Sequence, residues 1–176
     1  KDCYLEFIPD QIIPYKNSRY YQKVLLNVDP SASLIYSEII VPGRVAMGEL
    51  FSYDVCYLRT IGNDTKHTTK FIDNCILDPK NQKINTLGIF GNHTVVASVY
   101  ILAPKKLVTI LNPKINIMLK NNAEIYGGSS ILPNECGLLI RLLCNSSEIT
   151  KTEIYNIVRI ARKEILGVSF TEIRKT

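Results

Sequence analysis

Two carboxylates and one arginine lie close together around a predicted turn, and their chemistry depends on how they pair. Glu38 falls on the same face of a predicted strand as Tyr36, so we expect a half-buried carboxylate. A buried charge is costly unless it is paired, and Arg44, just after Gly43 of the turn, is the expected partner. Glu49 adds a second acid on the following strand. The pattern predicts an ion pair that fixes the turn, or alternatively a polar path or partner surface through an apolar scaffold.

Enzyme chemistry has little support in the residue types and their spacing. General acid–base catalysis by these carboxylates is the least favoured reading, because no histidine is near them in sequence. His67 and His93 fall in predicted loops, and neither has a second ligand at a metal-binding spacing. Cys136 has no neighbouring base, which favours a plain buried thiol over a nucleophile. The sequence contains no phosphate-binding glycine motif and no Gly-x-Ser-x-Gly motif.

Composition and charge narrow the class of protein further. Hydrophobic residues make up 46% and charged residues 21% of the 176 positions, which excludes intrinsic disorder. The five cysteines include no Cys-x-x-Cys pair, so we expect free thiols in a reducing compartment. The net charge is +5, with modest clustering at Arg159, Arg162 and Lys163. We read that cluster as the solvated face of a helix, with an acidic protein partner as the next choice.

The elements that must position these residues are mainly strands in the first hundred positions. Short apolar or β-branched runs end at Pro, Gly, Asn and Asp turns, a spacing typical of an all-β platform rather than of strand–helix–strand units. The predicted strands are residues 23–28, 33–41, 51–61, 71–77 and 95–102.

The last third predicts two helices and two more strands. Residues 105–122 have helical spacing, but Pro113 either kinks that helix or starts a new one. Gly127-Gly128 predicts a turn, followed by strands at 129–132 and 137–144. Thr150 and Glu153 have the spacing of a capping box at the start of the second helix, and Gly167 is a natural stop.

The chain is expected to form one domain over residues 1–176. It opens directly into strand-like sequence without an initiator Met, so we interpret it as lacking an N-terminal part. Its first ten residues do not resemble a signal peptide. The longest apolar run is too short to cross a membrane, and no membrane partner is expected.

The central segment, residues 34–49, reads LIYSEIIVPGRVAMGE and closely resembles the signature of the urease accessory protein UreD family, called UreH in some bacteria. Residues 5–15, 73–79 and 137–143 are similar to further segments of that family, so the resemblance covers nearly the whole chain. It corresponds to the C-terminal two-thirds of a family member.

The resemblance implies a mainly β fold, an elongated β-helix-like stack of strands with two helices in the C-terminal third. It also implies a non-catalytic cytoplasmic scaffold or chaperone of urease maturation. Such a protein would bind apo-urease and UreF, with the GTPase UreG joined through UreF, and would assist nickel delivery to the urease active site. No tightly bound cofactor is expected, and any nickel contact would be transient.

A nickel path through this scaffold would need weak, exchangeable oxygen ligands, because thiolates would hold the metal too firmly. Glu38, Glu49, Asp73 and Asp78 are the candidates. Arg159, Arg162 and Lys163 are the candidates for steering an acidic partner.

The rival hypothesis is a basic, β-rich nucleic-acid-binding module. It rests on the net charge of +5 and on strands that carry several tyrosines. No nucleic-acid partner is expected under the UreD reading, so the two hypotheses are distinguished by salt-dependent oligonucleotide binding.

Overall fold

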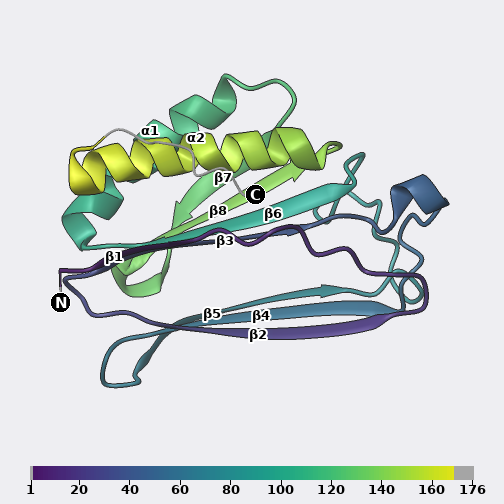
Figure 1. Ribbon diagram of the computed structural model, residues 1–176, viewed down its shortest axis with the longest axis horizontal. Coiled ribbons are helices and arrows are strands. Elements are labelled where there is room, and N and C mark those ends of the chain that lie inside the picture. Colours follow the sequence, from purple (N-terminus) through teal and green to yellow (C-terminus); the bar gives the residue numbers. More distant parts are fainter. Residues whose placement is uncertain (1, 169–176) are drawn as a thin grey trace.

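The protein forms three layers, seen edge-on in Figure 1, a view of the computed structural model, which describes residues 2–168. Two helices cover one face of a five-stranded sheet, and a three-stranded sheet lies against its other face. The larger sheet contains, in spatial order, β1 (Tyr4–Phe7), β3 (Ser33–Ile40), β6 (Val95–Leu102), β8 (Gly137–Cys144) and β7 (Tyr126–Ile131). All its neighbours pair antiparallel except β1 and β3, which are parallel.

The smaller sheet contains β2 (Arg19–Asn27), β4 (Val55–Asn63) and β5 (Thr69–Leu77). Strand β2 runs parallel to β4, and β5 runs antiparallel to it. All five strands predicted in the first hundred residues are present, although β2 and β5 begin earlier than predicted and β4 begins later. The short β1 corresponds to the strand-like sequence at the start of the chain.

Helix α1 (Lys105–Lys120) is one continuous element that contains Pro113, so a new helix does not start there. Helix α2 (Ser147–Leu166) ends at Gly167, as predicted, with a left-handed backbone and an N–H that donates to the Lys163 carbonyl. Two short 3₁₀ turns, η1 (Val45–Met47) and η2 (Pro133–Glu135), complete the elements.

The main hydrophobic core fills the space between the helices and the larger sheet. Strand alternation places every second residue of β3, beginning with Ile35, on this side, while the residues between them face the smaller sheet. The helices contribute one apolar face each, as their spacing predicts. The helix residues buried in this core are Val108, Leu111, Ile115, Leu119, Ile154, Ile157, Val158 and Ala161.

The space between the two sheets holds further apolar clusters and a column of aromatic rings. The ring of Tyr36 lies 5.8 Å from that of Tyr100, which lies 5.9 Å from that of Phe71, and both pairs are stacked. These rings join β3 and β6 of the larger sheet to β5 of the smaller one. The rings of such a column are apolar, but each tyrosine also brings a polar hydroxyl into the space between the sheets.

Two local predictions in the last third are wrong. Gly127 and Gly128 lie inside β7, paired with β8, instead of forming a turn. Glycine is needed at position 127 because a Cβ there would approach the Arg141 carbonyl oxygen to 2.6 Å. The cap of α2 is Ser146, whose hydroxyl accepts from the Ile149 N–H at 3.3 Å. Thr150 and Glu153 are therefore buried residues within the helix and do not form a capping box.

The mainly β fold with two helices toward the C-terminal end agrees with the prediction. The β-helix-like stack is not confirmed, since the strands of residues 2–168 lie in two sheets packed face to face. In the described part of the chain, neither helix has the length and apolar composition needed to span a membrane.

Candidate functional site

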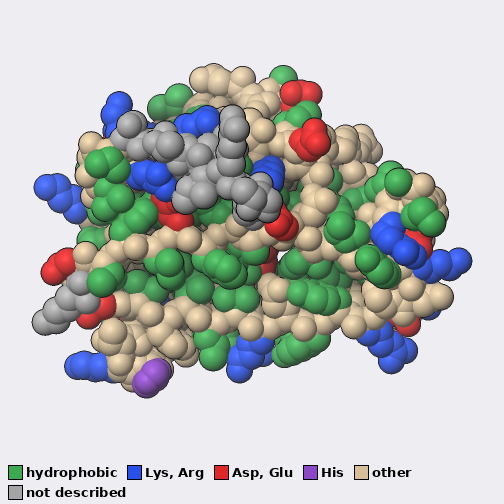
Figure 2. Space-filling model, in the orientation of Figure 1, with side chains coloured by type: hydrophobic (Ala, Val, Ile, Leu, Met, Phe, Trp, Pro, Cys, Tyr) green, Lys and Arg blue, Asp and Glu red, His purple; other side chains and the backbone are tan. Residues whose placement is uncertain are grey.

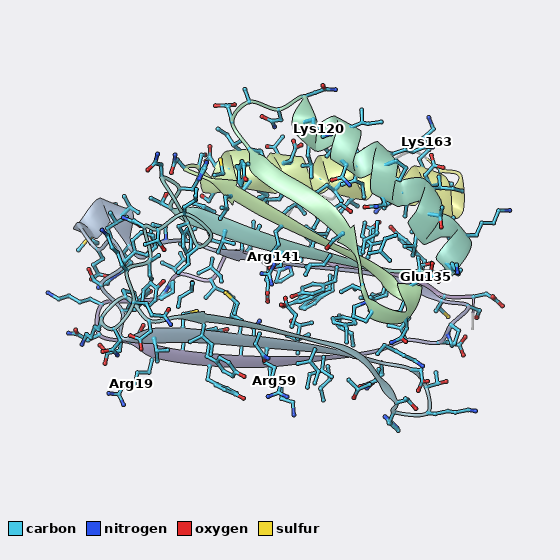
Figure 3. All side chains as sticks on the ribbon, turned by 180° about the vertical axis from the view of Figure 1, so that it is seen from behind. Arg19, Arg59, Lys120, Glu135, Arg141 and Lys163 are labelled. Carbon is cyan, nitrogen blue, oxygen red and sulfur yellow. The ribbon has the colours of Figure 1, made fainter. Side chains whose placement is uncertain are left out.

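A row of polar side chains crosses the larger sheet on the face that meets the smaller sheet. Glu38 on β3 is paired in register with Ser98 on β6, and Ser98 is paired in register with Arg141 on β8. Glu38 and Ser98 are buried, with 2% and 3% exposure. Figure 3 shows Arg141 between the two sheets. Three adjacent strands thus bring an acid, a hydroxyl and a base onto one line.

Arg141 joins the two sheets through hydrogen bonds and an ion pair. Its guanidinium donates to the Ser98 hydroxyl at 2.7 Å and pairs with the carboxylate of Asp73 on β5. The hydroxyl of Tyr100 donates to the same carboxylate at 2.5 Å. A buried ion pair needs such additional hydrogen bonds to offset the loss of hydration. The arrangement fixes how the sheets lie over each other.

Glu38 has hydrogen bonds but no direct cation among residues 2–168. Tyr36 donates to its carboxylate at 3.0 Å and Gln22 of β2 donates at 3.3 Å. The hydroxyl of Tyr20 in turn donates to the Gln22 side chain at 2.7 Å. Burial raises the pKa of Glu38 above its usual value, and the Tyr36 hydrogen bond and the charge of Arg141 offset part of that effect.

Arg44 pairs with Glu49 and not with Glu38, so the predicted partner is wrong. Its guanidinium donates to the two Glu49 oxygens at 2.9 and 2.5 Å and lies 4.3 Å from the centre of the Tyr15 ring. The Lys16 N–H donates to the same carboxylate at 3.1 Å. Glu38 does not pair with Arg44 because Glu38 lies within β3 between the sheets, whereas Arg44 follows the end of that strand. The Arg44 hydrogen bonds lower the pKa of Glu49.

The turn that presents Arg44 depends on Gly43. Its φ of +135° is a backbone conformation that is essentially restricted to glycine, and a Cβ there would lie 2.7 Å from the Glu49 carbonyl oxygen. Exposed apolar side chains lie on and beside this ion-paired turn, and we call this group the turn surface. It consists of Ile13, Tyr15, Val45, Met47 and Leu50, which are 40–70% exposed.

The four carboxylates proposed as nickel ligands do not form one cluster. Glu38 and Asp73 line the space between the sheets, close enough for the charge of Asp73 to raise the pKa of Glu38. Glu49 belongs to the Arg44 turn, and Asp78 accepts hydrogen bonds from Asn81 in the loop after β5. Within residues 2–168, no three His, Cys, Asp or Glu side chains are grouped so that they could hold a metal ion.

In the described part of the chain, the histidines and cysteines offer no nucleophile with an activating base. The five cysteines are free thiols, and burial raises the pKa of Cys56 to about 12. Burial also raises the pKa of Cys136, which keeps its thiol protonated at neutral pH. His67 lies in an exposed loop, while His93 is half-buried and stacks on Tyr126.

The basic residues of α2 have different surroundings from one another. Arg159 and Lys163 are exposed, and Figure 3 shows Lys163 at the outer side of the helix layer. The prediction of a solvated face is wrong for Arg162. Its side chain is only 17% exposed and forms a bidentate ion pair with Glu6 of β1. Arg162 therefore connects a helix to an edge strand, whereas Arg159 and Lys163 stay candidates for partner binding.

Sequence reasoning missed Arg141, Gln22 and the partnership of Tyr100 with Asp73. One signal was available: Arg141 is the only charged residue in the apolar run of β8, and such a charge needs a buried partner. The identity of that partner depends on the stacking of the two sheets, which no local pattern encodes.

Comparisons with known proteins relate the chain as a whole to one family. A family model described as UreD urease accessory protein matches residues 1–175. The urease accessory protein UreD of Cenarchaeum symbiosum is 35% identical over 175 residues, covering 99% of this chain and 61% of the relative. UreD 2 of Brucella suis is 35% identical over 97% of this chain and 57% of its own length. UreD of Yersinia pseudotuberculosis is 32% identical over 96% and 53%, respectively. The chain therefore spans between half and two-thirds of the length of these relatives.

Proposed function

Because this chain belongs to the UreD family of urease accessory proteins, we propose that it serves urease maturation as a non-catalytic scaffold. The observation that carries the proposal is the match of the family model to residues 1–175, together with relatives named as urease accessory proteins. The structure supports a scaffold in one further respect. Arg141 and Asp73 form an ion pair that joins the two sheets, as expected for groups that stabilise a fold.

The proposed partners are UreF, UreG held through UreF, and apo-urease, in the cytoplasm. The turn surface supports a role in binding, because exposed apolar groups held on a braced turn are suited to contacts with another protein. Arg44 and Glu49 would then act by positioning, since their ion pair fixes the turn that carries Val45 and Met47. The basic pair Arg159 and Lys163 would steer an acidic partner.

Nickel would be the cargo of this scaffold and not a resident cofactor. Glu38 and Asp73 are the two candidate carboxylates that lie together between the sheets, so they are the part of the proposed path that the geometry favours. Both are engaged by neutral or cationic side chains, and an entering cation would compete with Gln22, Tyr36 and Arg141 for them. Weak oxygen contacts of this kind suit transfer better than storage.

The test measures assembly and activation separately. The chain is mixed with UreF and apo-urease from the same source, and complex formation is followed by co-purification and light scattering. Urease activation with nickel and UreG is then measured with Glu38→Gln and Glu49→Gln variants, with Glu124→Gln, an exposed acid, as the control. If the variants still assemble but no longer activate urease, the proposed nickel path is supported. If activation is unchanged, Glu38 and Glu49 are not part of that path. Absence of any complex with the wild-type chain would reject the scaffold proposal.

A further inference from the structure

The smaller sheet presents a broad apolar surface on the side that faces away from the rest of the molecule. This outer face carries Tyr21 and Leu25 from β2 and Ile72 and Ile76 from β5, which are 50–64% exposed. The sheet is the outermost layer in Figure 1, with both helices on the opposite side of the molecule. Figure 2 shows hydrophobic and basic side chains along this margin of the molecule. Exposed apolar side chains gathered on one surface mark an interaction site more often than scattered ones do.

Two cations lie side by side at the centre of the outer face. Lys23 on β2 is paired in register with Arg59 on β4, and Asn74 on β5 completes the row. Like charges placed opposite each other on neighbouring strands destabilise a sheet. None of the strand positions that share this face is acidic. The arrangement lacks a countercharge within the strands that carry it.

Arg59 shows most directly that this countercharge is missing. Its Nε atom is buried yet has no hydrogen-bond acceptor within residues 2–168. A buried donor without an acceptor is uncommon in a native protein and costs stability. Figure 3 shows Arg59 directed away from the larger sheet, as is Arg19 farther along. The acid that precedes β4, Asp54, is shared by Arg19 and Lys80, so it is engaged elsewhere.

We infer that the outer face of β2, β4 and β5 docks a protein partner that presents a carboxylate to Lys23 and Arg59, surrounded by apolar side chains. The partner's acid would relieve the repulsion between the two cations and form an ion pair with them. Its apolar groups would cover the surrounding Tyr21, Leu25, Ile72 and Ile76. The inference rests on the proposed function in one respect, namely that this partner is a component of the urease assembly.

A protein suits this surface better than a nucleic acid does. Three of its four most exposed apolar groups are aliphatic, and bases stack on aromatic rings rather than on leucine or isoleucine. The ring of Tyr21 already packs against Tyr57, with 4.8 Å between ring centres. One pair of cations also offers little for the many phosphate contacts on which nucleic-acid affinity depends.

The experiment measures the affinity of the whole chain for UreF and for apo-urease by biolayer interferometry. The test variant is Lys23→Glu combined with Arg59→Glu. Its matched control is Lys83→Glu combined with Lys106→Glu, two exposed lysines outside the strands of this sheet. A second test variant, Ile72→Thr with Ile76→Thr, removes apolar contacts while keeping β-branched residues in the strand. Thermal melts of every variant check that folding is preserved.

Each outcome decides the inference. The inference is supported if the charge variant binds one partner about tenfold or more weakly than the wild type. The Ile variant should also bind that partner more weakly than the wild type, while the control binds like the wild type. Wild-type-like binding by the folded charge variant overturns the docking surface and leaves the scaffold proposal standing. If neither partner binds the wild-type chain, the scaffold proposal and the docking surface both fail. Salt-sensitive binding of a single-stranded oligonucleotide that is lost in the charge variant would assign the face to nucleic acid instead.

Discussion

Glu38 and Arg141 occupy the same cross-strand row with Ser98 between them, yet Arg141 forms its ion pair with Asp73 of the opposite sheet. Glu38 accepts hydrogen bonds from Tyr36 and Gln22. The row therefore contains one buried acid that has no ion pair within the described residues 2–168 and whose pKa is raised by burial. This separates the two acids of the interface into a structural one, Asp73, and one whose charge opposes folding.

Replacing Glu38 by Gln is expected to stabilise the protein at neutral pH by about 1 kcal/mol, because the change removes a buried charge and keeps a hydrogen-bond acceptor. The sign follows from the raised pKa. Below the pKa of the unfolded state, about 4.3, the acid is neutral in both states and the variant gains nothing. As pH rises from there through the higher native pKa, the wild type loses stability that the variant keeps.

Urea denaturation between pH 4 and pH 8 measures this difference. The exposed Glu124→Gln change serves as the control and should leave the free energy of unfolding nearly constant relative to the wild type. A Glu38→Gln variant that is less stable than the wild type at pH 8 would show that the carboxylate is stabilised as an ion, contrary to the expectation.

Glu49 should show the opposite pH dependence. Its pKa is lowered by hydrogen bonds from Arg44, so its ionised form favours the native state. That contribution is present above the unfolded pKa of about 4.3 and is lost as pH falls toward the lowered native pKa. Glu49→Gln should therefore be destabilised at pH 7, and the difference should shrink in acid. The same denaturation series measures it, and a constant difference down to pH 3 would contradict the assignment.

Gly43→Ala is expected to destabilise the protein by about 3 kcal/mol, because φ at +135° excludes a Cβ and the Glu49 carbonyl oxygen occupies its place. Gly48→Ala is the matched control in the same turn. Its φ is +70° and no atom lies within 4 Å of the new Cβ, so a cost of about 1 kcal/mol is expected. Thermal melts of both variants compare them, and equal losses would mean that contact with Glu49 contributes nothing.

Local patterns predicted most of the elements but not their partners. Alternation in residues 33–41 correctly assigned Glu38 to the face with Tyr36, because the strand period fixes sides without any knowledge of the fold. The partner of Glu38 was predicted wrongly. Arg44 is near Glu38 in sequence, but this does not show which way the chain turns after the strand ends. Its actual neighbours come from β2 and β8, far along the chain.

The helix start at Ser146 was missed for a similar reason. Both Ser146 and Thr150 are suitable caps, and Thr150 fitted the stricter motif. Burial settles the choice, since Glu153 lies inside the fold and accepts from Asn122 at the end of α1. A tertiary contact thus overrides a good local signal.

Arg162→Ala is expected to destabilise the protein by about 2 kcal/mol or more, because it leaves the mostly buried Glu6 without its cation and separates β1 from α2. Lys163→Ala, one residue along and exposed, should change the free energy of unfolding by less than about 0.5 kcal/mol. Chemical denaturation measures both. If the two variants are equally stable, the ion pair of Arg162 contributes nothing to stability. If Arg162→Ala is the less stable, charge reversal in binding studies should be made at Arg159 and Lys163 instead.

The neighbouring glycines of β7 should respond differently to the same substitution. Gly127→Ala places a Cβ 2.6 Å from the Arg141 carbonyl oxygen and 2.9 Å from the Leu142 side chain, so β7 must shift away from β8. We expect a loss of about 2 kcal/mol. At Gly128 the nearest atom is 3.8 Å away, and Ala should be neutral or stabilise by about 0.5 kcal/mol through the unfolded state. Thermal melts measure both effects. Two equal losses would indicate that the close approach at Gly127 contributes nothing to the difference.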